Sequence, residues 1–277
     1  AENLAFTSQW TENEADWTRY NAAVAAAAEK TGLADYAARY TEDSRNALAA
    51  ALAINVEGFK ATKQAEIDAA AKAIEDATAG LALMTYNAVF YVDGEVYETV
   101  PTKVDEAIAA PEAPSKTGYT FTGWTPEVGT MGTADVRFDA VFTEADNIAY
   151  TVETYTMDLN GEYGAAVSET KYGKTGATAT ETPAAKEGFT VADSSVLTGK
   201  IAADGSLVLK VYYSRNQYSL SFDGEATDVY YGAAIVAPTP TKDNYTFAGW
   251  DAEVPATMPA ENLAFTSQWT ENEADWT

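Results

Sequence analysis

Apolar residues recur at three- and four-residue steps through the first third of the chain, a spacing that places them on one face of a helix. Two further stripes of this kind lie in the segments 41–57 and 62–81. We therefore expect three amphipathic helices with short loops, packed as an antiparallel bundle over residues 13–83. The first stripe consists of Trp17, Tyr20, Val24 and Ala27.

Beyond residue 84 the pattern changes to short β-branched and aromatic runs, separated by turn signals about every ten residues. In residues 207–213 apolar positions alternate with their neighbours, as in a half-buried strand. This pattern predicts small β-rich modules. Tight hairpins are expected at the Asp-Gly and Asn-Gly pairs, which tolerate positive φ: Asp93-Gly94, Asn160-Gly161, Asp204-Gly205 and Asp223-Gly224.

The sequence AENLAFTSQWTENEADWT occurs twice, at residues 1–18 and 260–277, so that the second copy is offset by 259 positions. This identity predicts that the chain is one repeat of a tandem array. Several small domains per repeat are expected, because solenoid repeats are only about 20–50 residues long. We expect 260–270 to close the last β module. Residues Ala1–Thr11 should be an orphan strand, loosely held, packed on the first helix or paired with a neighbouring sheet edge.

Two segments of the β-rich part are copies of each other: residues 119–124 read YTFTGW and residues 245–250 read YTFAGW. This motif resembles that of the Listeria–Bacteroides repeat, a relative of the internalin B-repeat, which implies a β-grasp-like fold. Asn244 stands where the family usually has Gly. We expect Trp124 and Trp250 to occupy equivalent buried positions, each packed with the Tyr and Phe of its own motif.

Two other segments also resemble known modules. Residues 35–70, with Asp35-Tyr36 and the run Tyr40-Thr-Glu-Asp-Ser44, resemble the FIVAR module of bacterial surface proteins. That resemblance implies a three-helix bundle and no catalysis. Residues 150–216, with Gly188-Phe189 at their centre, resemble a mucin-binding-protein-like β-grasp module.

The expected architecture is multidomain α and β, an antiparallel three-helix bundle followed by three small β-grasp-like modules in an extended row. Such a row would have a radius of gyration of roughly 35–45 Å, against about 19 Å for a compact chain of this length. The expected division is 1–12, orphan terminal strand of the preceding repeat; 13–83, FIVAR-like bundle; 84–146, first β-grasp-like module; 147–215, mucin-binding-protein-like module; 216–271, second β-grasp-like module; and 272–277, start of the next repeat.

Composition narrows the possible partners. The formal net charge is −25, from 17 Lys and Arg against 42 Asp and Glu, which disfavours nucleic acid and anionic membranes. The absence of cysteine leaves no disulfides or thiolate metal sites. No apolar run approaches the roughly 18 residues of a membrane helix, and no signal peptide is present. We therefore expect any secretion signal or wall anchor to lie outside these residues.

Candidate chemistry is sparse. The chain has no histidine, which removes the usual general base and the commonest metal ligand. Asp158-Leu-Asn-Gly161 resembles part of a calcium loop but lacks the downstream Glu, so a plain turn is favoured and calcium is the alternative. Gly173-Lys174-Thr175 resembles the end of a phosphate loop, but Ser168 replaces its leading glycine, which favours a hairpin. Strand Tyr and Trp residues are assigned to packing, with sugar stacking as the alternative. No motif selects a Lys–Asn pair for an internal isopeptide bond.

These observations predict a chain that is not an enzyme and has no catalytic, cofactor-binding or metal-binding residues, while its ligand-binding residues stay unassigned. The expected function is a repeat unit of a secreted Gram-positive cell-surface protein, anchored to the wall through other regions. It would act as a stalk that projects an adhesive domain. Alternatively, the unit itself binds a host glycan or extracellular matrix protein. The expected partners are adjacent identical repeats in a monomer, without nucleic acid or membrane contact.

Overall fold

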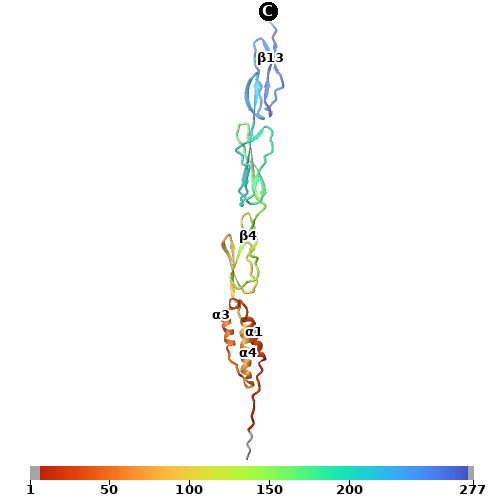
Figure 1. Ribbon diagram of the computed structural model, residues 1–277. Helices are drawn as coiled ribbons and strands as arrows, with labels where there is room; N and C mark the ends of the chain where they lie inside the picture. The colour runs from red at the N-terminus through yellow and green to blue at the C-terminus, as the bar shows by residue number, and fades with distance from the viewer. Residues whose placement is uncertain (1–6, 274–277) are drawn as a thin grey trace, which may run out of the picture. The chain divides into compact units, whose positions relative to one another are not determined.

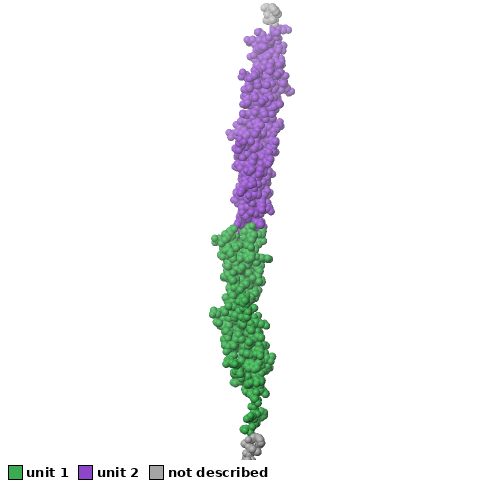
Figure 2. Space-filling model, in the orientation of Figure 1, with its two compact units in different colours: residues 1–114, 121–142 green, residues 115–120, 143–277 purple. Residues whose placement is uncertain are grey.

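The computed structural model describes residues 7–273 of the 277. The chain divides into two compact units, coloured separately in Figure 2. The first unit runs to residue 114 and includes residues 121–142, whereas the second comprises residues 115–120 and the chain from 143 onward.

The first unit begins with a helical region, in which α1 and α3 both pack against α4 (Figure 1). Helices lie in all three segments where the apolar stripes predict them, and the short helix α2 and the turn η1 are additional. The core is rich in alanine, which allows close approach of the helix backbones; it contains Ala23, Ala27, Leu48, Ala51, Ala71 and Ile74. The elements are α1 Thr18–Thr31, α2 Tyr36–Arg39, α3 Glu42–Leu52, the 3-10 helix η1 Ala61–Lys63 and α4 Gln64–Ala79.

The first β region is a four-stranded sheet in the order β2-β1-β4-β3. Strand β1 pairs antiparallel with β2 and parallel with β4. The predicted hairpin at Asp93-Gly94 is confirmed, with φ of 52° and 90° at its two residues. The strands are β1 Thr85–Val92, β2 Glu95–Lys103, β3 Tyr119–Thr125 and β4 Val136–Glu144. Their core contains Ala88, Phe90, Ile108, Met131 and Phe138.

Hydrogen bonds connect the helical region to this sheet within the first unit. The N–H of Met84 donates to the carbonyl of Arg39 at 2.8 Å, and the Tyr86 hydroxyl donates to the carbonyl of Ala38 at 2.8 Å. The Arg39 guanidinium also binds Asp35, which directly precedes α2, and Asp105, which lies beyond β2. The chain therefore passes from helix to sheet through a bonded junction.

The second β region has a four-stranded sheet, β6-β5-β10-β8, and a two-stranded sheet, β7-β9. Strands β5 and β10 are parallel, as β1 and β4 are in the first region. The predicted alternation in residues 207–213 is confirmed, because Leu209, Val211 and Tyr213 are buried in the core. The strands are β5 Ile148–Thr156, β6 Val167–Gly173, β7 Thr178–Thr180, β8 Phe189–Val191, β9 Thr198–Lys200 and β10 Val208–Arg215.

The third β region repeats the first with an interruption. Its sheets are β12-β11-β14 and β13-β15, and β11 pairs parallel with β14. Phe222 pairs with Phe265 across β11 and β14, as Phe90 pairs with Phe138 across β1 and β4. Residues 263–271 are thus divided between β14 and β15, whereas β4 is continuous. The strands are β11 Gln217–Phe222, β12 Glu225–Tyr230, β13 Tyr245–Trp250, β14 Leu263–Phe265 and β15 Ser267–Glu271.

Candidate functional site

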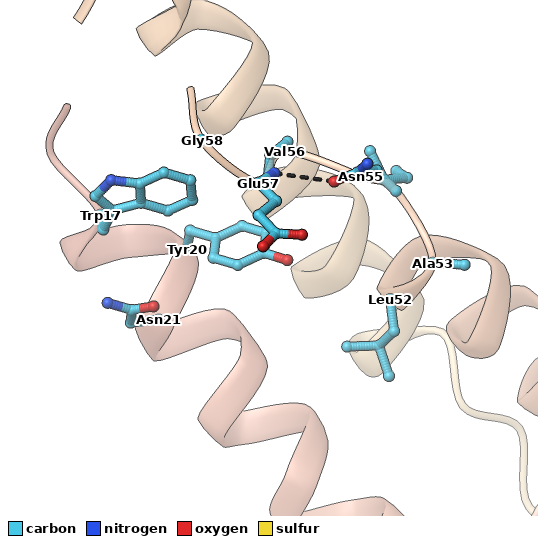
Figure 3. A pocket seen from close by; sticks show the side chains of 10 residues that line it. Trp17, Tyr20, Asn21, Leu52, Ala53, Asn55, Val56, Glu57 and Gly58 are labelled. Carbon is cyan, nitrogen blue, oxygen red and sulfur yellow. Dashed lines mark hydrogen bonds between the residues drawn. The ribbon is translucent and has the colours of Figure 1, made fainter. Parts of the chain in front are cut away.

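A groove of about 570 Å³ lies between the start of α1 and the loop that follows α3. Trp17 and Tyr20 meet edge to face in this groove, with ring centroids 5.6 Å apart. Figure 3 shows both rings beside Glu57, whose N–H donates to Oδ1 of Asn55 at 2.9 Å. Aromatic faces next to amide and carboxylate groups suit a small polar ligand with an apolar side, such as a sugar ring.

The tryptophans of the two YTF motifs occupy equivalent positions, as predicted. The Trp124 ring lies 4.8 Å from Phe90 and 5.3 Å from Phe121, and the Trp250 ring lies 4.7 Å from Phe222 and 5.3 Å from Phe247. The prediction that the two indoles are buried is confirmed only in part. Both indoles are half-buried and cover the edge of their cores, because buried phenylalanines of the neighbouring strands fill the centre.

The two copies of the duplicated sequence occupy different surroundings. Residues 260–270 contribute β14 and most of β15, so the predicted closing strand is confirmed. Of the predicted orphan segment, residues 1–6 lie outside the described residues, and residues 7–11 form no helix or strand. Trp10 is 90% exposed, whereas its twin Trp269 packs edge to face on Phe247 at 5.7 Å. The same local bond, from indole Nε1 to the serine two residues earlier, occurs in both copies.

The Asp158 carboxylate forms a turn with the backbone. Its Oδ1 accepts the N–H of Asn160 at 2.8 Å and that of Glu162 at 2.9 Å. These bonds, that from Glu162 above all, hold the pKa of Asp158 below its usual range. Within residues 7–273, no group of three or more His, Asp or Glu side chains is arranged to hold a metal ion.

The linker residues Ala145 and Asn216 use both of their backbone groups to join successive parts of the second unit. The N–H of Ala145 donates to the carbonyl of Gly118 at 3.0 Å, and its carbonyl accepts the N–H of Thr175 at 2.9 Å. Asn216 repeats this arrangement, with its N–H on the carbonyl of Gly188 and its carbonyl on the N–H of Tyr231, both at 2.9 Å.

In each linker the first partner is a glycine with positive φ, and the residue beyond the linker lies directly against that glycine. Thr175 donates its hydroxyl to the Gly118 carbonyl at 2.6 Å. The Tyr231 ring fills the space that a Cβ on Gly188 would occupy. The sequence analysis rejected a phosphate loop at Thr175 and predicted a hairpin there. It did not predict the contact of Thr175 with Gly118, because the two residues are 57 positions apart in the sequence.

Comparison with known proteins identifies the repeated β segments at residues 86–149 and 210–274. Both segments match the Listeria-Bacteroides repeat domain. The resemblance inferred from the YTF motifs is therefore confirmed, although the matched residues cover less than half of the chain.

Internalin H of Listeria monocytogenes is 29% identical over 202 residues, which cover 68% of this chain and 26% of internalin H. The chain thus spans about a quarter of that relative's length. Similar solved structures include the crystal structure of Mub-RV, at 16% identity and a TM-score of 0.18. Another contains domains 3–4 of Streptococcal High Identity Repeats in Tandem from a cell surface protein, at 21% identity and a TM-score of 0.18. Each alignment covers 48% of this chain and 98% of the other.

The matches indicate a repeat of surface-protein type, and the families they name are repeat domains, not enzymes. Among the described residues, no helix combines the length and apolar character needed to cross a membrane.

Proposed function

We propose that this chain is a non-catalytic repeat of a secreted bacterial cell-surface protein and acts as a stalk that projects an adhesive domain from the wall. The duplicated sequence carries this proposal. Residues 260–271 close a sheet by pairing with β11 and β13, whereas the matching residues 7–11 are exposed and pair with no strand. In a tandem array, each copy would close the third β region of one repeat and lead into the helices of the next.

The local structure supports a positional function. We propose that the repeat consists of four modules. A FIVAR-like bundle covers residues 13–83, and three β-grasp-like modules cover residues 84–146, 147–215 and 216–271. Ala145 and Asn216, at two of these boundaries, bond to both sides through the backbone. Short bonded linkers oppose folding back, and the net charge of −25 disfavours contact between modules.

Small-angle scattering tests the stalk directly. We expect a radius of gyration of roughly 35–45 Å for this chain, against about 19 Å for a compact fold of equal length. A chain with one more repeat should nearly double the maximum dimension. A value near 19 Å that does not change with salt would exclude the stalk.

The groove at Trp17 and Tyr20 supports a second candidate, in which the repeat itself binds a host glycan or matrix protein. An array of glycans and matrix proteins, probed with chains of one and two repeats, separates the two functions. A binding repeat gains avidity with copy number, whereas a spacer binds nothing. Glu57→Gln, which changes a groove side chain that is exposed to solvent, should weaken groove-dependent binding, with Glu98→Gln on β2 as the matched control.

A further inference from the structure

The backbone arrangement at Ala145 and Asn216 occurs a third time, divided between the two ends of the chain. The N–H of Asn272 donates to the carbonyl of Asn244 at 2.9 Å, which is the first half of the arrangement. Asn13 holds the same position in the other copy of the duplicated sequence, and its carbonyl accepts the N–H of Ala61 at 3.1 Å, which is the second half.

The two halves do not compete for the same atoms. Asn272 uses its N–H and its side-chain Oδ1, which accepts the Thr246 hydroxyl at 2.7 Å just as Asn216 accepts that of Thr190 at 2.8 Å. Asn13 uses its carbonyl. A single copy of the sequence can therefore make both sets of bonds at once.

Neighbouring side chains fasten the first copy to the helical region. Glu12 accepts the N–H of Thr62 at 2.8 Å, and Glu14 pairs with Lys60 at 2.6 Å. Glu271, the twin of Glu12, pairs with β13 through its backbone and keeps its side chain exposed. The side-chain contacts of Glu12 and the backbone pairing of Glu271, the last residue of β15, use different atoms and can therefore coexist in one copy of the sequence.

We infer that the third β region of one repeat and the helical region of the next form a fixed joint, in which the shared asparagine bonds to Asn244 on one side and to Ala61 on the other. The partner is a second copy of this repeat in the same polypeptide. The inference rests on the tandem arrangement of the proposed function.

The sizes of the paired residues agree with this joint. At the Asn216 joint the Tyr231 ring fills the space beside Gly188, whereas at the Ala145 joint Ala203 fills the space beside Gly118 and Thr175 bonds to the Gly118 carbonyl. At the third, Asn244 takes the glycine position with φ of 64°, which asparagine tolerates better than most residues. Its counterpart Ala61 is small. By analogy with the Asn216 joint, we expect the Asn244 side chain to take the space that Tyr231 fills beside Gly188, and to lie against Ala61 of the next repeat.

Spin-label distance measurements on a two-repeat chain test the joint, and the absence of native cysteine makes the labelling specific. One pair of labels spans the proposed joint. These labels are attached to cysteines that replace Thr227 in the first repeat and Asn46 in the second, both of which are exposed. A pair at Ser168 and Thr227 spans the known joint at Asn216 and gives the reference width. We expect both distance distributions to be equally narrow.

An insertion of Gly-Ser-Gly between Asn272 and Glu273 should broaden the first distribution several-fold. The same insertion between Asp93 and Gly94, in the exposed hairpin turn between β1 and β2, should leave the distance distribution unchanged. A broad distribution in the parent chain, equal to that of the insertion variant, would overturn the joint.

A size-swap experiment tests the contact itself. Ala61→Tyr in the second repeat should shift or broaden the distance across the joint, and adding Asn244→Gly in the first repeat should restore it. Ala61→Tyr in the first repeat, which no third β region precedes, is the matched control and should have no effect. If the substitution in the second repeat behaves like this control, the Asn244–Ala61 contact is wrong.

The outcomes also separate this inference from the proposed function. Binding of a glycan or matrix protein by a single repeat would contradict the spacer function and leave the narrow distribution intact. A broad distribution together with a large radius of gyration would remove the joint and keep the spacer.

Discussion

Trp10 and Trp269 have the same neighbours along the chain and different neighbours in space. Trp10 is 90% exposed, whereas Trp269 is half-buried against Phe247, which belongs to a strand that begins 24 residues earlier. Burial of an aromatic ring stabilises the fold roughly in proportion to the apolar area removed from water. The pair therefore isolates the contribution of packing at constant local sequence.

We expect Trp269→Ala to destabilise the third β region by about 2–3 kcal/mol, below the usual cost of truncating a fully buried Trp because the ring is only half-buried. Trp10→Ala should change the stability by less than about 0.5 kcal/mol. Denaturant unfolding followed by hydrogen exchange of the β13 amides measures both changes. Equal effects of the two substitutions would contradict the packing described for Trp269.

Two constraints favour glycine at position 188: a positive φ and the close approach of the Tyr231 ring. Gly94 has only the first of these constraints, so a comparison of the two glycines distinguishes their effects. Both have positive φ, 73° and 90°, but a Cβ on Gly188 would collide with the Tyr231 ring, whereas a Cβ on Gly94 would meet nothing within 4 Å. Gly94→Ala should therefore cost only the strain of the turn, about 1 kcal/mol. Gly188→Ala should cost more and should also reduce hydrogen-exchange protection of the Asn216 and Tyr231 amides. Unchanged protection of these two amides would show that the joint does not depend on the close approach.

At the level of elements, the helices are held by an alanine-rich core and by an ion pair between the exposed faces of α1 and α4. Arg19 on α1 binds Glu75 on α4 through two hydrogen bonds of 2.9 and 2.6 Å. Hydrogen bonding to the guanidinium lowers the pKa of the Glu75 carboxyl. Both side chains are more than 40% exposed, so the pair contributes modestly and mainly orients α1 on α4.

This pair gives the helical region a dependence on pH. A carboxyl whose pKa is lower in the folded state adds stability above its unfolded pKa of about 4.3, and that stability is lost as the pH falls through the lowered value. The thermal midpoint followed by circular dichroism at 222 nm should therefore fall between pH 5 and acid pH more steeply than in Glu75→Gln. Acidification also reduces the overall negative charge of the chain, but this effect on the thermal midpoint is nearly the same in both proteins and is removed by the comparison. Parallel curves for the two proteins would show that the pair does not contribute.

Across the whole molecule, contacts define two compact units, although the sequence is most easily divided into four modules. In the first unit, the Tyr86 hydroxyl on β1 donates to the carbonyl of Ala38 in α2 at 2.8 Å, and this bond is partly buried. Such bonds make the helical region and the first sheet interdependent. A boundary that is visible in the sequence therefore need not be a boundary of cooperative unfolding.

Tyr86→Phe should destabilise the first unit by about 1 kcal/mol, because it leaves a partly buried carbonyl without its donor. Calorimetry should show a lower transition temperature for the helical region and the first sheet together. The matched control is Tyr97→Phe, whose exposed hydroxyl is 3.4 Å from the carbonyl of Glu112, and which should have little effect. A shift confined to the helical signal would show that the two parts unfold independently.

The sequence by itself determined the features that depend on neighbours along the chain. Periodic apolar residues located the helices, because a stripe at three- and four-residue steps can be buried only on a helical face. Asp93-Gly94 and Asp223-Gly224 located hairpins, because their backbones accept positive φ. The YTF motifs identified the repeated β segments, and the duplication at residues 1–18 and 260–277 indicated the array.

Only the tertiary structure decided the surroundings of these residues. The half-burial of Trp124 depends on how Phe90 fills the core, and the function of Thr175 depends on the Gly118 carbonyl 57 positions away. Residues 7–11 and their copies at 266–270 are the clearest case: only the second set forms a strand, because a strand forms only where a partner strand offers its backbone. Local sequence fixes which conformations a segment can adopt, and contacts from distant segments select among them.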